Sequence, residues 1–97
     1  MNMQKILAEA KKMQASLDKK IAEFDSKEFE YNYKNYISIK MKGNLEIISI
    51  SIDNQLVDPE DKNILEEMVA EAVNEAVSKT SAEKNKVTQI AMPKMPF

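Results

Sequence analysis

Apolar and polar residues alternate over residues 37–53 (ISIKMKGNLEIISISID), on both sides of Gly43, the only glycine of the chain. A period of two is typical of β-strands, whose side chains point to opposite faces of a sheet in turn. Two strands joined at Gly43 and Asn44 cannot bury an apolar face by themselves. The pattern therefore predicts an antiparallel hairpin that flanking helices or a second chain must cover.

The residues before this hairpin show first a helical period and then a strand period. From Met3 to Phe24, apolar residues recur at helical spacing over about six turns, with no Pro or Gly between them. A short aromatic stretch follows, in which Phe29, Tyr31 and Tyr33 share one face of a strand. We expect a long helix followed by a strand whose polar face is solvated.

The last of the three expected strands contains a change of phase. Ile48, Ile50 and Ile52 share one face, but Leu45 and Ile47 are out of step with them. Two explanations are open at this point. Either a β-bulge lies near Ile47 and Ile48, or the second face of the sheet is also covered there, as a dimer contact would do.

A second helix is predicted to begin near Asp58 and Pro59. An acceptor side chain followed by Pro suits the N-cap and the first helical position. The helix is expected to end before Pro93. Its apolar face consists of seven residues at helical spacing: Ile64, Leu65, Met68, Val69, Ala72, Val73 and Ala76.

Together these patterns predict an α+β fold with a long N-terminal helix, a three-stranded antiparallel sheet and a long C-terminal helix. We expect one domain over residues 1–91 and a flexible tail over residues 92–97. A chain of 97 residues is near the size at which a single core gives only modest stability, so burial shared in a homodimer would help.

The net charge of −2 conceals a segregation of charge along the chain. Residues 1–22 hold five Lys and two acidic residues, a net charge of +3, whereas residues 58–78 hold one Lys and seven acidic residues, a net charge of −6. Lys5, Lys12 and Lys19 repeat every seven residues on the side of the first helix opposite its apolar stripe. Such a helix can follow the phosphates of duplex DNA without reading bases.

Three segments together resemble the YbaB/EbfC family of bacterial nucleoid-associated proteins over most of the chain. They are a first helix rich in Met, Gln and Lys, the IxIKMKGNLEIISISID pattern, and LVDPEDKNILEEMVAEAVNEAVSK with a terminal KMPF. The resemblance implies small DNA-binding homodimers with an α-β-β-β-α layout and a tweezer-like outline. The family often has glycines ahead of the second strand, where this chain has Asn32, Lys34 and Asn35, and Gly-rich sequence near the C-terminus, which this chain lacks.

The resemblance turns an ambiguous lysine face into a predicted DNA interface. From pattern alone, lysines on an exposed helix are more often a solvated surface. The predicted contacts to duplex DNA are Lys5, Lys11, Lys12, Lys19, Lys20, Lys84 and Lys86, and Lys94 could extend them. The predicted dimer interface comprises Leu45, Ile47, Tyr31 and Tyr33. Because all basic residues are Lys and none is Arg, we expect little direct base readout and any preference to come from DNA shape.

Other functions find little support in the residue types present. With no His, no Cys and no Gly-rich phosphate loop, we expect no enzyme, metal, cofactor or small-molecule substrate. The acids near the second helix start (Asp58, Glu60, Asp61) are explained by the helix dipole. The N-terminal segment reads as neither a signal peptide nor a membrane span, so we expect a cytoplasmic, nucleoid-associated protein. The alternatives are a dimeric protein-interaction module and a membrane-surface helix at residues 3–24.

Overall fold

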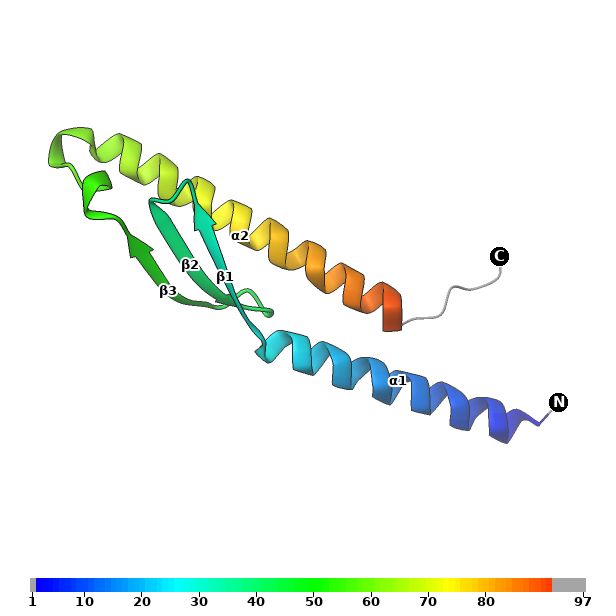
Figure 1. Ribbon diagram of the computed structural model, residues 1–97. Helices are drawn as coiled ribbons and strands as arrows, with labels where there is room; N and C mark the ends of the chain where they lie inside the picture. The colour runs from blue at the N-terminus through cyan, green and yellow to red at the C-terminus, as the bar shows by residue number, and fades with distance from the viewer. Residues whose placement is uncertain (1, 92–97) are drawn as a thin grey trace.

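The computed structural model describes residues 2–91, in which two long helices flank a three-stranded antiparallel sheet (Figure 1). The strands follow one another across the sheet in the order β1-β2-β3. This confirms the predicted α+β architecture; the predicted tail at 92–97, with Lys94, lies outside the described residues. The elements are α1 (Met3–Ser26), β1 (Glu28–Tyr33), β2 (Ile37–Lys42), β3 (Ile47–Ile52) and α2 (Lys62–Ala91), with short 3₁₀ turns at Asn54–Leu56 and Pro59–Asp61.

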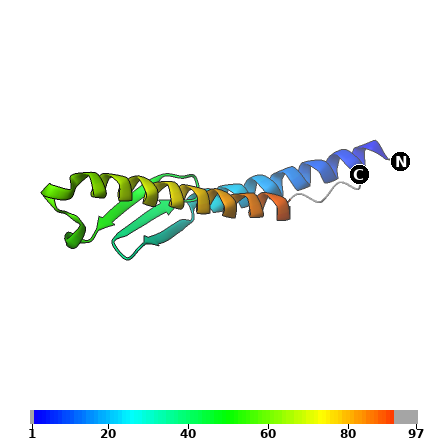
Figure 2. The ribbon, with the colours of Figure 1, turned by 90° about the horizontal axis from the view of Figure 1, so that it is seen from above.

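The molecule is a rod. It measures 72 × 26 × 16 Å, and its radius of gyration is 19.8 Å. A compact chain of this length would have a radius of about 12.5 Å. The excess arises because α1 leaves the end of the sheet and continues well past it, as Figures 1 and 2 both show.

The core lies between the sheet and α2, which runs along one face of it (Figure 2). Ile37, Ile39 and Met41 of β2 are buried against Ala72 and Ala76 of α2. The small alanines let the helix backbone approach the central strand closely, so that the large side chains fill the space between the layers. Burial alternates along β2, as the period-two pattern predicts.

A β-bulge accounts for the change of phase in β3. Lys40 pairs with Ser49 and Met41 pairs with Ile47, so Ile48 is the extra residue on its strand. The bulge explanation is therefore confirmed. Because β3 is an edge strand that α2 does not cover, Ile47, Ile48 and Ile50 are each about 40% exposed.

The first hairpin shows how this chain manages without glycines ahead of the second strand. Lys34 and Asn35 both have positive φ, at 50° and 62°, and the Tyr36 amide donates to the Tyr33 carbonyl at 3.0 Å. Positive φ at both central residues is characteristic of a type I′ turn, whose twist matches that of the flanking strands. Asn tolerates this conformation well, whereas Lys adopts it at a cost.

The second hairpin uses its glycine for close packing rather than for an unusual φ. No glycine among residues 2–91 has positive φ; the residue that takes this conformation is Leu45, with φ of 73°. A Cβ built on Gly43 would lie 2.0 Å from the Phe24 carbonyl oxygen and 2.6 Å from its ring. Gly43 thus lets the hairpin pass directly against the end of α1.

The second helix starts three residues later than predicted. Asp58 does act as a cap, accepting from the Glu60 amide at 3.0 Å, but the turn it caps is the 3₁₀ turn beginning at Pro59. The α-helix itself begins at Lys62. Tight 3₁₀ turns of this kind are common at helix N-termini, and the sequence signals for the two are the same.

The first helix is packed at only one end. Phe24 is 7% exposed and Leu17 and Ile21 are half-buried, whereas every residue of α1 before Leu17 is exposed. We call residues 3–20 the arm and residues 21–91 the body. Where the two meet, the Lys84 Nζ lies 3.0 Å from the Asp25 Oδ1, and this ion pair ties α1 to α2.

Candidate nucleic-acid interface

The arm holds five of the seven lysines predicted to contact DNA. Asn2 caps α1 by accepting from the Gln4 amide at 3.1 Å, and the helix then runs without interruption to Ser26. Seven-residue spacing along a helix places Lys5, Lys12 and Lys19 about 10 Å apart on one side. The five arm lysines are all exposed: Lys5, Lys11, Lys12, Lys19 and Lys20.

These five lysines differ from the two on α2 in their electrostatic surroundings. Within residues 2–91, no carboxylate lies within 4.0 Å of an arm lysine. Lys84, by contrast, pairs with Asp25 at the joint, and Lys86 lies 3.1 Å from the Glu83 Oε1. An arm lysine can therefore neutralise a phosphate without first giving up an acidic partner.

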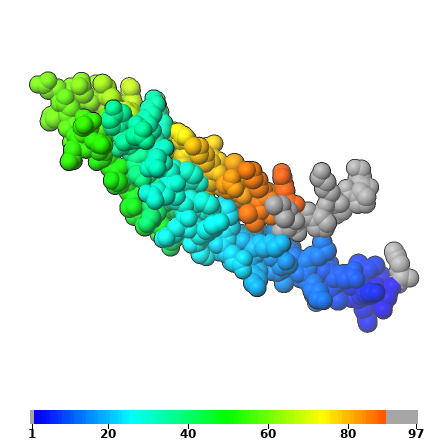
Figure 3. Space-filling model, viewed as in Figure 1, coloured from blue at the N-terminus to red at the C-terminus, as the bar shows by residue number. Residues whose placement is uncertain are grey.

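The opposite end of the rod is acidic. Residues 58–78 carry a net charge of −6, and their single lysine, Lys62, lies 3.5 Å from the Glu66 carboxylate. In Figure 1 this end of α2 is at the upper left, and the start of α1 is at the lower right. The space-filling view shows the arm, in blue, protruding beyond the body (Figure 3). The separation of charge along the rod directs a polyanion toward the arm.

The four predicted dimer residues fall on two different edges of the sheet. Leu45 and Ile47 lie at the start of β3 and are about 40% exposed. Tyr31 and Tyr33 lie on β1, at the other edge, and both are packed against the core under α2. No single flat contact at β3 would include all four.

Both β1 tyrosines are hydrogen-bonded to α2 of the same chain. Tyr31 Oη and Thr80 Oγ1 are 2.8 Å apart, and Thr80 Oγ1 donates to the Met41 sulfur at 3.6 Å. The Tyr33 hydroxyl donates to the Glu71 carboxylate. This bond is the main reason why the pKa of Tyr33 is raised above its ordinary value of 10.0, since the carboxylate favours the protonated phenol.

Thr80 is a residue that the sequence analysis missed. It is fully buried, yet the predicted apolar face of the second helix ended at Ala76. The signal was present, because Thr80 continues the four-residue spacing of Ala72 and Ala76. A polar residue at such a position can be read as core only when its partner, here Tyr31, is known.

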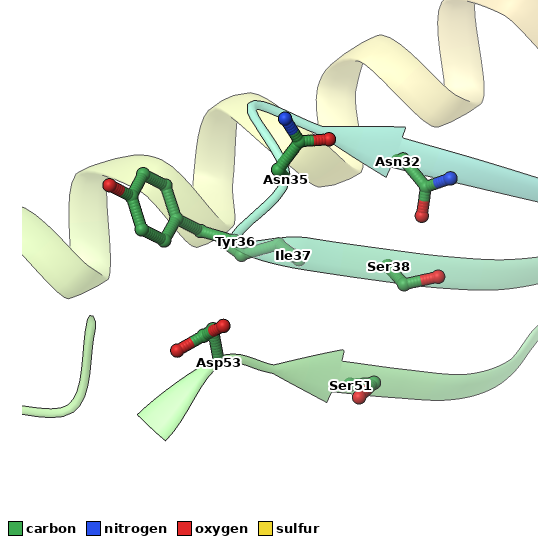
Figure 4. Close-up of a pocket in the computed structure, with 7 residues that line it drawn as sticks. All are labelled: Asn32, Asn35, Tyr36, Ile37, Ser38, Ser51 and Asp53. Carbon is green, nitrogen blue, oxygen red and sulfur yellow. The ribbon is translucent and has the colours of Figure 1, made fainter. Parts of the chain in front are cut away.

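The outer face of the sheet holds a pocket of about 160 Å³ beside the first hairpin turn (Figure 4). Its single carboxylate, Asp53, already accepts from the Gln55 amide at 2.8 Å. Most of the lining side chains are short and polar. The lining consists of Asn32, Asn35, Ser38, Ser51 and Asp53, together with Tyr36 and Ile37. In the described part of the chain, no three His, Cys, Asp or Glu side chains gather closely enough to hold a metal ion. Nor does any helix there have the length and apolar character to cross a membrane.

Comparison with known proteins finds relatives that match almost the whole chain. The chain is 54% identical to a nucleoid-associated protein of Malacoplasma penetrans over 93 residues, covering 96% of this chain and 99% of the relative. It is 48% identical to one of Ureaplasma urealyticum over 94 residues, covering 97% and 95%. It is 31% identical to one of Streptococcus agalactiae over 98 residues, covering 100% and 99%.

The family that these relatives suggest is also found directly. The model of the YbaB/EbfC DNA-binding family matches residues 1–95, which includes both helices and all three strands. This family is one of bacterial nucleoid-associated DNA-binding proteins rather than enzymes. The protein is thus a member of the YbaB/EbfC DNA-binding family.

Proposed function

We propose that this protein binds duplex DNA in the nucleoid as a homodimer, through contacts between its arm lysines and phosphates and with little direct base readout. The observation that carries the proposal is the exposed row of Lys5, Lys12 and Lys19, which has no acidic partner among residues 2–91. The names of the relatives and of the family support DNA as the partner.

The dimensions of the arm suit such a contact. From Lys5 to Lys19 the helix rises about 21 Å, and duplex DNA rises about 3.4 Å per base pair. An arm lying along the duplex axis therefore covers about six base pairs with three lysines. Lys11 and Lys20 flank this row, while Lys84 and Lys86 would add less because each must leave a carboxylate.

The homodimer is proposed to form at the edge of β3. An edge strand with exposed isoleucines is a ready template for pairing with another strand, and proteins normally cover such edges. Leu45 adds to the argument. It keeps a large apolar side chain 42% exposed at a φ of 73°, where Gly or Asn would cost less. A second copy covering Leu45 and Ile47 would account for this arrangement.

The DNA contact is tested by the salt dependence of binding. Each lysine that neutralises a phosphate contributes about 0.9 to the slope of log K against log salt, so in a dimer each position contributes about 1.8. Replacing Lys5, Lys12 and Lys19 by Gln should flatten the slope by about 5 in anisotropy titrations on generic duplex DNA. Lys62→Gln, an exposed helical lysine at the acidic end, is the matched control and should leave the slope unchanged.

Two outcomes would contradict the proposal. Absence of binding at about 0.05 M salt would leave the protein as an interaction module without nucleic acid. A binding-site selection that returned a sharp consensus would contradict lysine-only phosphate recognition, because a lysine reads base edges poorly.

The homodimer is tested separately, by two substitutions on opposite faces of β3. Ile47→Lys places a charge on the apolar face of β3 and should halve the mass in light scattering. Ser49→Lys places the same charge on the outer face and should leave the mass unchanged. A monomeric wild-type protein at every concentration would overturn the dimer without touching the DNA contact.

A further inference from the structure

The arm has a second surface that the DNA contact does not use. Its apolar stripe continues the stripe that packs Phe24 into the body, but every residue of the arm before Leu17 is exposed in the described part of the chain. The exposed members include Met3 at 73% and Leu7 at 57%, followed by Ile6 and Met13. An amphipathic helix that leaves most of its apolar stripe in water lacks much of the burial that normally stabilises it.

The opposite end of the rod carries unpartnered apolar side chains of its own. Val57 is 55% exposed and Ile64, at the start of α2, is 50% exposed. On the helix, Glu67 and Glu71 lie three and seven residues beyond Ile64, so they share its side. Leu7 of the arm has Lys11 four residues beyond it on its own side, so the charge beside this leucine is opposite to the charge beside Ile64.

Each chain therefore has two complementary ends. The arm combines apolar residues with a net charge of +3, and the acidic end combines apolar residues with a net charge of −6. A rod 72 Å long holds the two apart, as Figures 1 and 2 show, so no chain can place its own arm on its own acidic end. The contact is available only between copies.

We propose that the apolar stripe of the arm docks on the acidic end of a second copy of this chain, with Leu7 against Ile64 and Lys11 toward Glu67. Charge selects this occupant over the other apolar candidate, a second arm. Two arms packed stripe to stripe would bring like charges together, whereas arm and acidic end attract one another. Such a contact joins different surfaces of the two partners.

The docking and the central row of DNA-contacting lysines use different sides of the same helix, and Lys11 lies at the boundary between them. Lys5, Lys12 and Lys19 point away from the apolar stripe, so they face outward when the stripe is covered. Neighbouring copies on one duplex would then be joined by contacts between the arm of one copy and the acidic end of the next. The inference does not rest on the proposed DNA contact, because the docking surfaces exist without it.

Disulfide trapping tests the docking, and the chain is suited to it because it has no Cys. Proteins carrying L7C and I64C are mixed without DNA under mild oxidation, and the heterodisulfide is measured by non-reducing electrophoresis. We expect its yield to exceed by at least about tenfold that of L7C mixed with S49C, a position on the outer sheet face. The yield should fall steeply between about 0.05 M and about 0.5 M salt, where charges are screened.

Controls separate this result from the other proposals. The same pair is tested with Ile47→Lys present in both proteins, which removes the β3 contact; the heterodisulfide should persist. Charge reversal by Lys11→Glu in the L7C protein should reduce the yield, and Glu67→Lys in the I64C protein should restore it. Equal trapping of L7C with S49C, or dominant trapping of L7C with itself, would overturn the proposal.

Discussion

The two parts of α1 have the same apolar spacing and opposite surroundings. In the body, Phe24 is buried, with its ring centroid 5.2 Å from that of Phe29 and its carbonyl against Gly43. In the arm, Leu7 occupies the same stripe but is 57% exposed. Periodicity therefore identifies the face of a helix that will pack, but whether anything is present to pack against it is decided by the rest of the assembly.

The largest predicted effect is the difference in unfolding free energy between truncating Phe24 and truncating Leu7. Phe24→Ala should lower the free energy of unfolding by about 4 kcal/mol, because it removes a buried aromatic and leaves a cavity. Leu7→Ala should change it by less than about 0.5 kcal/mol at low protein concentration, since the side chain is exposed. Urea unfolding followed by circular dichroism, at one fixed protein concentration, measures both. Equal losses would show that the arm is packed even when dilute.

The next largest effect concerns the joint between the hairpin and α1. Gly43→Ala should cost about 3 kcal/mol, because a methyl group cannot fit against the Phe24 carbonyl. Truncating Phe24 in the same protein should not rescue it, since the nearest atom belongs to the backbone. Asn44→Ala, which removes only the acceptor for the Glu46 amide, is the control and should cost about 1 kcal/mol. Rescue by Phe24→Ala would show that the ring, not the carbonyl, sets the close approach.

A smaller effect of opposite sign is expected at the two strained turn residues. Leu45→Gly and Lys34→Gly should each stabilise the chain by about 1 kcal/mol, because glycine adopts positive φ freely. Only Leu45→Gly should also weaken dimerisation, measured by light scattering over a dilution series. If both variants dimerise as the wild type does, the exposed Leu45 side chain has no part in the interface.

The smallest predicted effect is a change in the pKa of Tyr33, which lies in the body. The hydrogen bond to Glu71 raises the pKa of Tyr33 above 10.0, so this bond contributes to stability below pH 10.0 and is lost as the pH rises through the raised pKa. Glu71→Gln should move that pKa back toward 10.0, as read from the tyrosinate absorbance. Tyr33→Phe removes the signal and assigns it. The arm contains no Tyr, so the signal reports on the body alone. An unchanged titration in Glu71→Gln would assign the raised pKa to burial.

The elements and their order follow from the periods of the sequence, because the amphipathic pattern of each helix and strand is regular whether or not its apolar side is covered. The change of phase in β3 is compatible with a bulge or with a covered second face, and only the pairing of Met41 with Ile47 decides between the two. The role of Gly43 was not predictable from the hairpin, since a lone glycine in a turn suggests backbone freedom. Its true constraint comes from Phe24, nineteen residues earlier in the chain.

The lysines of the candidate interface also differ in how far the sequence predicts their surroundings. Lysine spacing on α1 predicts one basic side, and the structure agrees that Lys5, Lys12 and Lys19 are exposed. The same counting could not separate Lys84, because its partner Asp25 is far away in sequence and meets it only where α1 packs beside α2. Charge patterns along one element are local, whereas ion pairs between elements depend on the fold.

The ion pair between Lys84 and Asp25 lies at the packed end of the long helix α1. A helix of 24 residues is about 36 Å long, so one degree of rotation at its root moves its tip by about 0.6 Å. A tilt of ten degrees would therefore shift the first turn of the arm by about 6 Å, close to two base-pair steps. Where the positive charge of this protein falls in space is thus governed by a few atoms at the far end of the helix that carries it.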